Sequence, residues 1–140
     1  MSTITLKNRQ PSTDKPATPV TLEQQRAQFA WGCAQSGVGA AGEKYRNLAK
    51  AAPAMIMNNG LMQTLAFLNS KNERHHQELG GHLRRWLSVR TGGPDRDIGF
   101  EPAMKAMLDF DPDNYRQATD EALLILRWIR QFAAALRSHS

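Results

Sequence analysis

Residues 115–136 read YRQATDEALLILRWIRQFAAAL, and this stretch decides the fold class. Its apolar side chains recur every three or four positions, at Tyr115, Ala118, Ala122, Ile125, Ile129, Phe132 and Leu136. At about 100° of rotation per residue, they fall on one face of a helix. A separate flank, roughly 130° from the centre of that face, carries Arg116, Arg127, Arg130 and Arg137. The stretch therefore predicts a long amphipathic helix with a core face and a basic flank.

A first helix is expected near the N-terminal end of the chain. Thr21, with Gln24 three residues later, has the spacing of a capping box, in which each side chain bonds the other residue's backbone N–H. Apolar positions then recur as far as about Ser36. The glycine-rich stretch SGVGAAG, residues 36–42, predicts a break after it.

The middle of the chain holds two further helical patterns separated by a stop signal. A second helix is expected over 40–51, and Pro53 is expected to end it and open a short helix. Asn59-Gly60 is typical of a helix end, because glycine tolerates the left-handed backbone of a C-cap. The run LMQTLAFL, residues 61–68, then predicts a separate helix whose buried stripe is Leu61, Leu65 and Leu68.

Helices are also expected over 72–89 and 100–109, and no segment has the alternating pattern of a strand. We therefore predict an all-α protein, a compact bundle of six or seven helices with no sheet. Residues 21–140 form the single helical domain in this interpretation. Residues 1–20 are polar and proline-dotted, which predicts a flexible N-terminal tail.

Size and composition favour a small cytoplasmic protein. The chain has 140 residues, which fits one domain. No stretch approaches the roughly 18 apolar residues of a membrane span, and the first residues lack the apolar core of a signal peptide. The single cysteine, Cys33, fits a reducing compartment and is expected to be a small buried side chain on a helix. Trp31, Trp86 and Trp128 lie beside or on apolar faces and are expected in the core.

Charge is segregated along the chain, whose net charge is +5. Residues 26–90 carry nine Lys/Arg against three acids, residues 95–121 carry eight acids against three bases, and residues 127–137 carry three Arg. Two basic segments thus flank an acidic one. This pattern favours an anionic partner, or contact between the acids of one copy and the bases of another. The plain alternative is a mixed solvated surface.

Motifs for catalysis are scarce. There is no P-loop, no GxGxxG after a strand and no CxxC pair, and no local signature makes Cys33 a nucleophile. Four residues resemble metal ligands at first sight, His75, His76, Glu78 and His82. The HExxH order is absent and nothing fixes a third ligand, so polar residues on an exposed helix are the preferred interpretation. We expect no cofactor and no metal.

The acidic run DFDPDNYRQATD, residues 109–120, has two interpretations. Asp109, Asp111, Asp113 and Asp120 occupy positions 1, 3, 5 and 12 of a calcium-binding loop, but Asn114 replaces the glycine needed at position 6. The competing interpretation is a turn followed by a helix cap, because Asp and Asn favour turns and acids favour helix N-termini.

The segment KYRNLAKAAPAMIMNNGLMQTLAFLNSK, residues 44–71, resembles the small helical subunit of type III-B CRISPR effector complexes, the Cmr complexes. The shared features are Lys-Tyr, an apolar-Pro segment, Asn-Gly-Leu, an apolar helix and Ser-Lys. HLRRWL, residues 82–87, and the final helix, residues 115–136, fit the same pattern. The resemblance covers about residues 22–137.

This resemblance implies a non-catalytic subunit that stacks on copies of itself beside guide RNA and target RNA, with backbone and large CRISPR subunits as partners. RNA-backbone contacts would come from Lys44, Arg46, Lys50, Lys71, Arg84, Arg85, Arg127 and Arg130. The separation of charge along the chain, and not the resemblance, leads us to expect that contacts to the next copy use Asp109, Asp111 and Asp113. Two alternatives remain at this stage, a basic helical DNA-binding regulator and a metal-dependent enzyme. The sister small subunit of type III-A complexes is a third.

Overall fold

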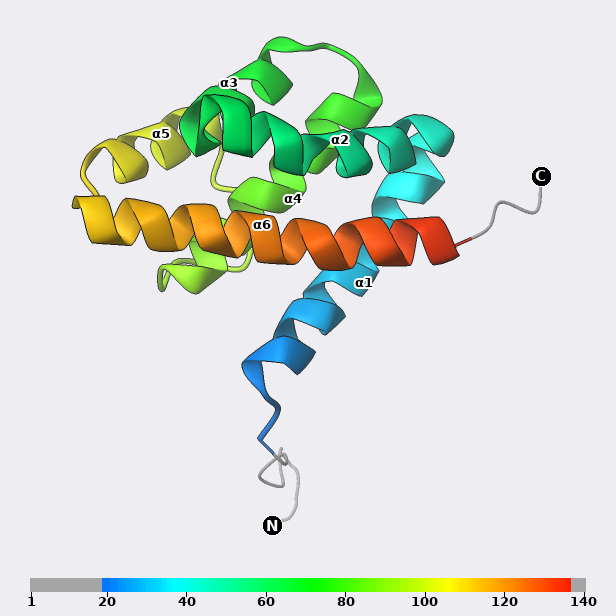
Figure 1. Cartoon of the computed structure of the whole chain (residues 1–140), viewed down its shortest axis with the longest axis horizontal. Coiled ribbons are helices and arrows are strands. Elements are labelled where there is room, and N and C mark those ends of the chain that lie inside the picture. Colours follow the sequence, from blue (N-terminus) through cyan, green and yellow to red (C-terminus); the bar gives the residue numbers. More distant parts are fainter. Residues whose placement is uncertain (1–18, 137–140) are drawn as a thin grey trace.

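The computed structural model describes residues 19–136 and shows six helices with no strand among them (Figure 1). They are α1 (Leu22–Ala41), α2 (Glu43–Asn59), α3 (Leu61–Ser70), α4 (Arg74–Arg90), α5 (Phe100–Leu108) and α6 (Pro112–Ala135). The predicted all-α bundle is confirmed for this part of the chain. Most of the predicted tail, residues 1–18, and residues 137–140 lie outside the described residues. Every helix within 19–136 is too short or too polar to cross a lipid bilayer.

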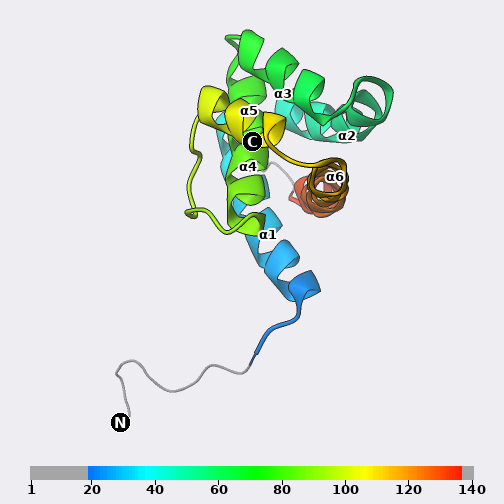
Figure 2. The same ribbon diagram turned by 90° about the vertical axis from the view of Figure 1, so that its left-hand side faces the viewer.

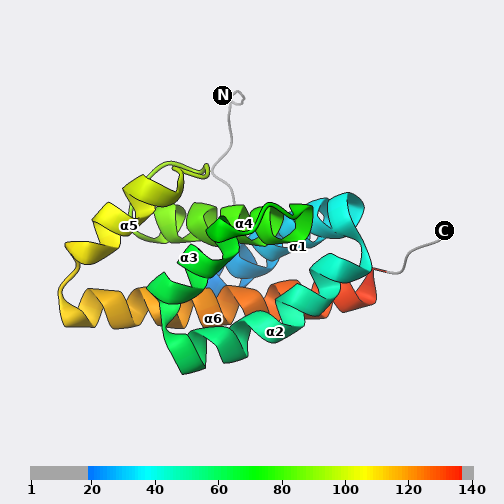
Figure 3. The same cartoon turned by 90° about the horizontal axis from the view of Figure 1, so that it is seen from above.

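The longest helix, α6, is the axis on which the others are arranged. Helices α1, α2 and α4 all pack against it. Seen from above, α4 and α6 lie side by side with α2 along the other flank of α6 (Figure 3). Seen along α6, the helices α1, α4 and α5 lie to one side of it (Figure 2). The start of α1 extends away from the bundle (Figure 1).

The core is built from the periodic apolar positions. Leu61, Leu65 and Leu68 of α3 are fully buried, as predicted from their spacing. On α6, Ile125 and Ile129 are fully buried too. The buried stripe of α6 consists of Ala118, Ala122, Ile125, Leu126, Ile129 and Ala133. The predicted members at the two ends of that stripe are half-buried and pack at its edge.

The predicted break over residues 36–42 was wrong, because α1 continues through it and ends only at Gly42. A Cβ built on Gly37 would lie 2.3 Å from ring carbons of Tyr45, so Gly37 allows the buried ring of α2 to pack directly on the backbone of α1. The chain turns at Gly42, which has a positive φ of 56°. Gly37 therefore permits close packing of α1 and α2, and Gly42 permits the turn between them.

Pro53 was expected to end a helix, and this was also wrong, because α2 runs through it to Asn59. A proline inside a helix removes one backbone hydrogen bond and crowds the preceding turn. Ala49 and Ala52, before the proline, and Ile56, after it, are all buried in the core. Burial of this stripe holds both halves of α2 against the core and outweighs the lost bond.

The predicted stop at Asn59-Gly60 is confirmed. Gly60 has a φ of 90°, its N–H donates to the carbonyl of Ile56, and α3 begins at the next residue. The free N–H of Met62 at the start of α3 donates to Tyr115 Oη at 3.1 Å. The chain thus reverses at Gly60, and a side chain from the far end of the sequence closes the first turn of α3.

Candidate nucleic-acid interface

The structure divides the eight predicted RNA-contacting residues into two groups. Three already donate to partners within the chain, namely Arg46, Arg84 and Arg85, although the side chain of Arg85 is 42% exposed. Five are exposed and form no salt bridge with another residue of the described range, namely Lys44, Lys50, Lys71, Arg127 and Arg130.

Arg84 lies on the buried side of α4 and is only 6% exposed. Its Nε and Nη2 each donate to a carboxylate oxygen of Asp97 at 2.8 Å. Burial alone would raise the pKa of Asp97, but the bonds from Arg84 and from the Gly99 N–H outweigh it and hold that pKa below its ordinary value. Arg84 therefore fixes the loop between α4 and α5 and has no free face for RNA.

Arg85 and Arg46 are occupied in similar ways. Arg85 Nε donates to Asp95 at 2.6 Å, and its guanidinium lies 4.7 Å from the centre of the Phe29 ring of α1. Arg46 donates to the carbonyl of Ala133 at 2.9 Å and to that of Leu136, where α6 ends. The contacts of Arg46 satisfy carbonyls that the C-terminus of α6 leaves unpaired, and they hold α2 against α6.

Three of the exposed cations lie on the outer surface of α2 and α6, and we call Lys50, Arg127 and Arg130 the α2–α6 basic face. Lys50 is four residues after Arg46, so it lies on the side of α2 that meets α6. Arg127 and Arg130 are three residues apart, which places them about one turn apart on the exposed side of α6. Helices α2 and α6, which pack against each other, thus each carry exposed cations.

Of the other two cations, Lys44 lines an open groove between the end of α1, the start of α2 and the start of α4, and Lys71 lies just before α4. This α2–α4 groove has a volume of about 470 Å³ and is lined by Ala40, Ala41, Lys44, Glu73, Arg74 and His75. Lys71 lies three residues before Arg74, and its ammonium is 5.1 Å from the centre of the Phe67 ring. Arg74 was not predicted as a site residue. Its sequence signal was the spacing to Lys71, which puts one cation at the end of α3 and another at the start of α4.

The acidic residues predicted to contact the next copy are exposed at the turn between α5 and α6. Asp111 is the N-cap of α6 and accepts a hydrogen bond from the Asn114 N–H at 2.8 Å, so the interpretation as turn plus helix cap is confirmed. Asp113 pairs with Arg116 at 2.8 Å. Asp109 immediately follows α5. The carboxylates are available at the surface without a second role in the core.

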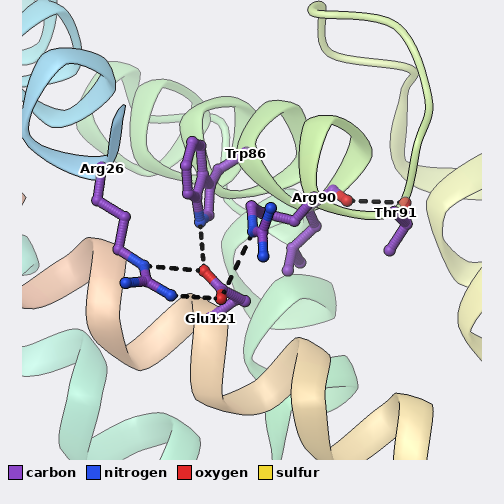
Figure 4. A network of polar contacts seen from close by, with 6 residues as sticks. Arg26, Trp86, Arg90, Thr91 and Glu121 are labelled. Atoms are coloured by element: carbon purple, nitrogen blue, oxygen red, sulfur yellow. Dashed lines mark hydrogen bonds and ion pairs between the residues drawn. The ribbon is translucent and has the colours of Figure 1, made fainter. Parts of the chain in front are cut away.

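Other acids of the same segment are neutralised inside the molecule, most clearly at Glu121 (Figure 4). Its carboxylate accepts from Arg26 at 2.7 and 3.2 Å and from the Trp86 indole N–H at 3.2 Å, and it lies 3.5 Å from Arg90. Burial alone would raise the pKa of Glu121, but these donors outweigh it and hold the pKa below its ordinary value. We call these four residues the Glu121 cluster, and it joins α1, α4 and α6.

Cys33, considered above as a nucleophile, and the Glu78–His82 pair both have other roles in the structure. Burial raises the pKa of the Cys33 thiol to about 12, so the side chain is an inert core group, as expected. His82 Nδ1 lies 2.8 Å from the buried Tyr45 Oη, and its Nε2 lies 3.5 Å from Glu78. Burial lowers the pKa of His82 in spite of that carboxylate.

The comparisons with known proteins match this small helical architecture. The family model described as CRISPR-associated protein (Cas_Cmr5) matches residues 22–136, which is the region folded into the six helices. The chain belongs to the Cmr5 family. The Cmr5 family match begins at the first residue of α1 and ends at the C-cap of α6.

A curated sequence and a solved structure from Thermus thermophilus both support the Cmr5 assignment. The protein named CRISPR system Cmr subunit Cmr5 is 29% identical over 93 residues, which is 66% of this chain and 75% of that protein. The crystal structure of a CRISPR-associated Cmr5 family protein superposes with a TM-score of 0.69 at 26% identity and covers 86% of this chain and 100% of that one. The predicted resemblance is thus confirmed, and the alternative of a DNA-binding regulator gains no support.

Proposed function

We propose that this protein is a non-catalytic, cytoplasmic small subunit of a CRISPR Cmr effector complex and contacts the phosphate backbone of RNA. The observation that carries the proposal is the family match over all six helices, together with a positively charged surface whose cations are left unused by the fold. A subunit that serves many guide sequences needs contacts to phosphates rather than to bases.

The proposed RNA-contacting residues are the α2–α6 basic face, Lys50, Arg127 and Arg130, together with Lys44 of the α2–α4 groove and the exposed Lys71. Arg46, Arg84 and Arg85 are left out, because their guanidinium groups already donate to partners in the same chain. Lys and Arg bind phosphate through charge and release condensed counterions, so the affinity should fall steeply with salt.

The test compares RNA binding by the wild type and by the variant Lys50→Glu/Arg127→Glu/Arg130→Glu. We expect weaker binding to RNA in a fluorescence-anisotropy titration at several salt concentrations. The slope of log K against log salt should become shallower by about 0.7–0.9 for each phosphate contact removed. Unchanged affinity and slope would remove the α2–α6 basic face from the proposal.

A matched control is available on the opposite charge segment. The variant Arg96→Glu/Lys105→Glu replaces two exposed cations outside α6, and it changes the net charge by the same amount as the double variant Arg127→Glu/Arg130→Glu, with which it is compared. Arg96 and Lys105 lie within the acidic segment, so we expect a smaller loss of affinity and little change in the salt slope. An equal loss in the two variants would mean that net charge, and not the α2–α6 basic face, governs binding.

We further propose that copies of the protein stack in a filament, with Asp109, Asp111 and Asp113 of one copy facing the basic surface of the next. Their exposure and the separation of charge along the chain support this arrangement. The variant Asp109→Asn/Asp113→Asn keeps the Asp111 helix cap. It should reduce self-association at low salt in sedimentation velocity, and unchanged assembly would refute this contact.

Membership of the complex has its own test, independent of the RNA contacts. A tagged protein purified from its native cells should bring down the other Cmr subunits together with guide-length RNA. Recovery of the protein alone, without RNA or other subunits, would refute the proposed function.

A further inference from the structure

A cluster of potential metal ligands lies at the start of α4, away from the α2–α6 basic face. Glu73, His75 and His76 each offer a ligand atom, and these atoms all lie within 4.8 Å of one another. Glu73 is the N-cap of α4, and the two imidazole rings follow in its first turn with centres 4.1 Å apart. This trio combines two of the four residues noted in the sequence, His75 and His76, with Glu73, and it does not include the Glu78–His82 contact.

His76 gives a second, independent sign of a ligand site. The residue is 8% exposed, its Nδ1 is buried, and that nitrogen has no hydrogen-bond partner. It is the one buried side-chain nitrogen or oxygen of residues 19–136 in this condition. An unpaired buried polar atom costs free energy, on the order of 1–3 kcal/mol. The ring is held in place from behind by Phe67, whose centre is 5.8 Å away in an edge-to-face arrangement.

The geometry matches the separation that a tetrahedral metal requires. Ligand atoms about 2.1 Å from a zinc ion lie roughly 3.4 Å from one another. His76 Nδ1 and Glu73 Oε1 are 3.4 Å apart. The other ligand atoms lie no more than 4.8 Å apart, so they must approach by at most about 1.4 Å. They can do so by side-chain rotation, because Glu73 is exposed and His75 is half-buried.

We propose that Glu73, His75 and His76 form a binding site for a divalent transition-metal ion, with Zn²⁺ as the representative ion. Two imidazole nitrogens and one carboxylate suit Zn²⁺ and similar ions better than Mg²⁺ or Ca²⁺, which prefer oxygen ligands. Three protein ligands leave a fourth position for water. That position can open toward the α2–α4 groove, because Glu73 and His75 both line it.

The charges around the proposed site determine where its affinity for a metal ion must come from. Lys71 and Arg74 flank it, and only one carboxylate offsets their charge, so attraction by the local field contributes little. Binding must then come from the three coordinate bonds themselves. For this reason we expect the affinity to be sensitive to the removal of any single ligand.

The experiment uses the untagged full-length protein after removal of metal with a chelator and desalting. Zn²⁺ is titrated in a calorimeter, and Co²⁺ is titrated in parallel because its absorption spectrum reports tetrahedral coordination. We expect one ion per chain. We also expect Glu73→Gln and His75→Asn each to weaken binding at least about tenfold, because even the loss of an outer partner of a metal ligand costs that much.

Two control variants distinguish this site from others on the same chain. Glu78→Gln removes the acid of the second Glu–His pair, and His139→Asn removes the histidine outside the described residues. Both should bind Zn²⁺ like the wild type. Circular dichroism in metal-free buffer checks that each variant is folded, and the two ligand substitutions are at exposed or half-buried positions.

Three results would overturn the proposal. The first is no saturable Zn²⁺ uptake by the wild type, and the second is wild-type affinity in both Glu73→Gln and His75→Asn. The third is a loss of affinity in Glu78→Gln or His139→Asn instead. None of these outcomes depends on RNA or on other subunits, so the metal site and the proposed function are tested separately.

Discussion

Replacing Glu121 by Gln tests whether the Glu121 cluster is a structural cross-link between three helices. The change keeps the shape of the side chain but removes its charge, and it places an amide N–H₂ among the donors of Arg26, Trp86 and Arg90. The side chains of Arg26 and Glu121 are 15% and 14% exposed, so the guanidinium would lose its counterion at a site that water reaches only in part. We expect a loss of about 3 kcal/mol in the free energy of unfolding, the lower end for breaking a buried pair.

The size of this effect is measured against an exposed pair. Asp113→Asn breaks the Asp113–Arg116 salt bridge, whose N···O distance is 2.8 Å but whose side chains are 74% and 68% exposed. Solvent screening limits such a pair to below about 1 kcal/mol. Urea denaturation followed by circular dichroism at neutral pH measures the loss of unfolding free energy in both variants. The loss expected for Glu121→Gln corresponds to a Tm lower by roughly 10 °C. If Glu121→Gln costs no more than Asp113→Asn, the reasoning is refuted.

The dependence on pH gives a second check on the Glu121 cluster. The pKa of Glu121 is held below its ordinary value of 4.5, so the folded state binds a proton on this group less readily than the unfolded state does. The stabilisation is therefore fully present above pH 4.5 and is lost as the pH falls through the lowered pKa. The difference between the wild type and Glu121→Gln should shrink over that acidic range, and a constant difference would contradict the assignment.

Two further predictions concern the contact between α1, α2 and α4. Gly37→Ala puts a methyl group 2.3 Å from the Tyr45 ring and should lower the free energy of unfolding by about 1–3 kcal/mol. The methyl group of Gly39→Ala meets no atom within 4 Å, so this variant should be more stable by about 1 kcal/mol. If the urea midpoints of the two variants shift in the same direction, this packing is contradicted. Burial lowers the pKa of His82, so the wild type should lose stability as the pH falls from 6.5 toward the lowered value. His82→Asn should lack this part of the pH dependence, and an identical pH profile in the variant would show that another group titrates.

Local signals predicted most of the elements of the fold. The stop at Gly60 and the stripe Leu61, Leu65 and Leu68 follow from short-range chemistry, and both are confirmed. The break placed over 36–42 was wrong because the role of Gly37 depends on a ring eight residues further along the chain. Pro53 was misread for a related reason, since burial of the whole stripe of α2 outweighs one missing hydrogen bond.

The candidate site was less predictable, because charge in a sequence carries no information about its partner. Arg84 and Arg127 are both arginines on amphipathic helices, yet Arg84 is paired and buried while Arg127 is exposed. The difference comes from Asp97, which a loop brings back to α4. Trp31 shows the opposite error, since it was expected in the core but is 42% exposed and packs edge-on against Phe132.

The projecting start of α1 has a consequence for how the molecule opens. No residue between Leu22 and Phe29 is fully buried, and Ala30 is the first that is. The ion pair from Arg26 to Glu121 ties these turns to α6 (Figure 4). This end of the helix should therefore unravel and re-form without global unfolding. Amide hydrogens before Ala30 should exchange with solvent faster than those of the α6 core, and Glu121→Gln should widen that gap.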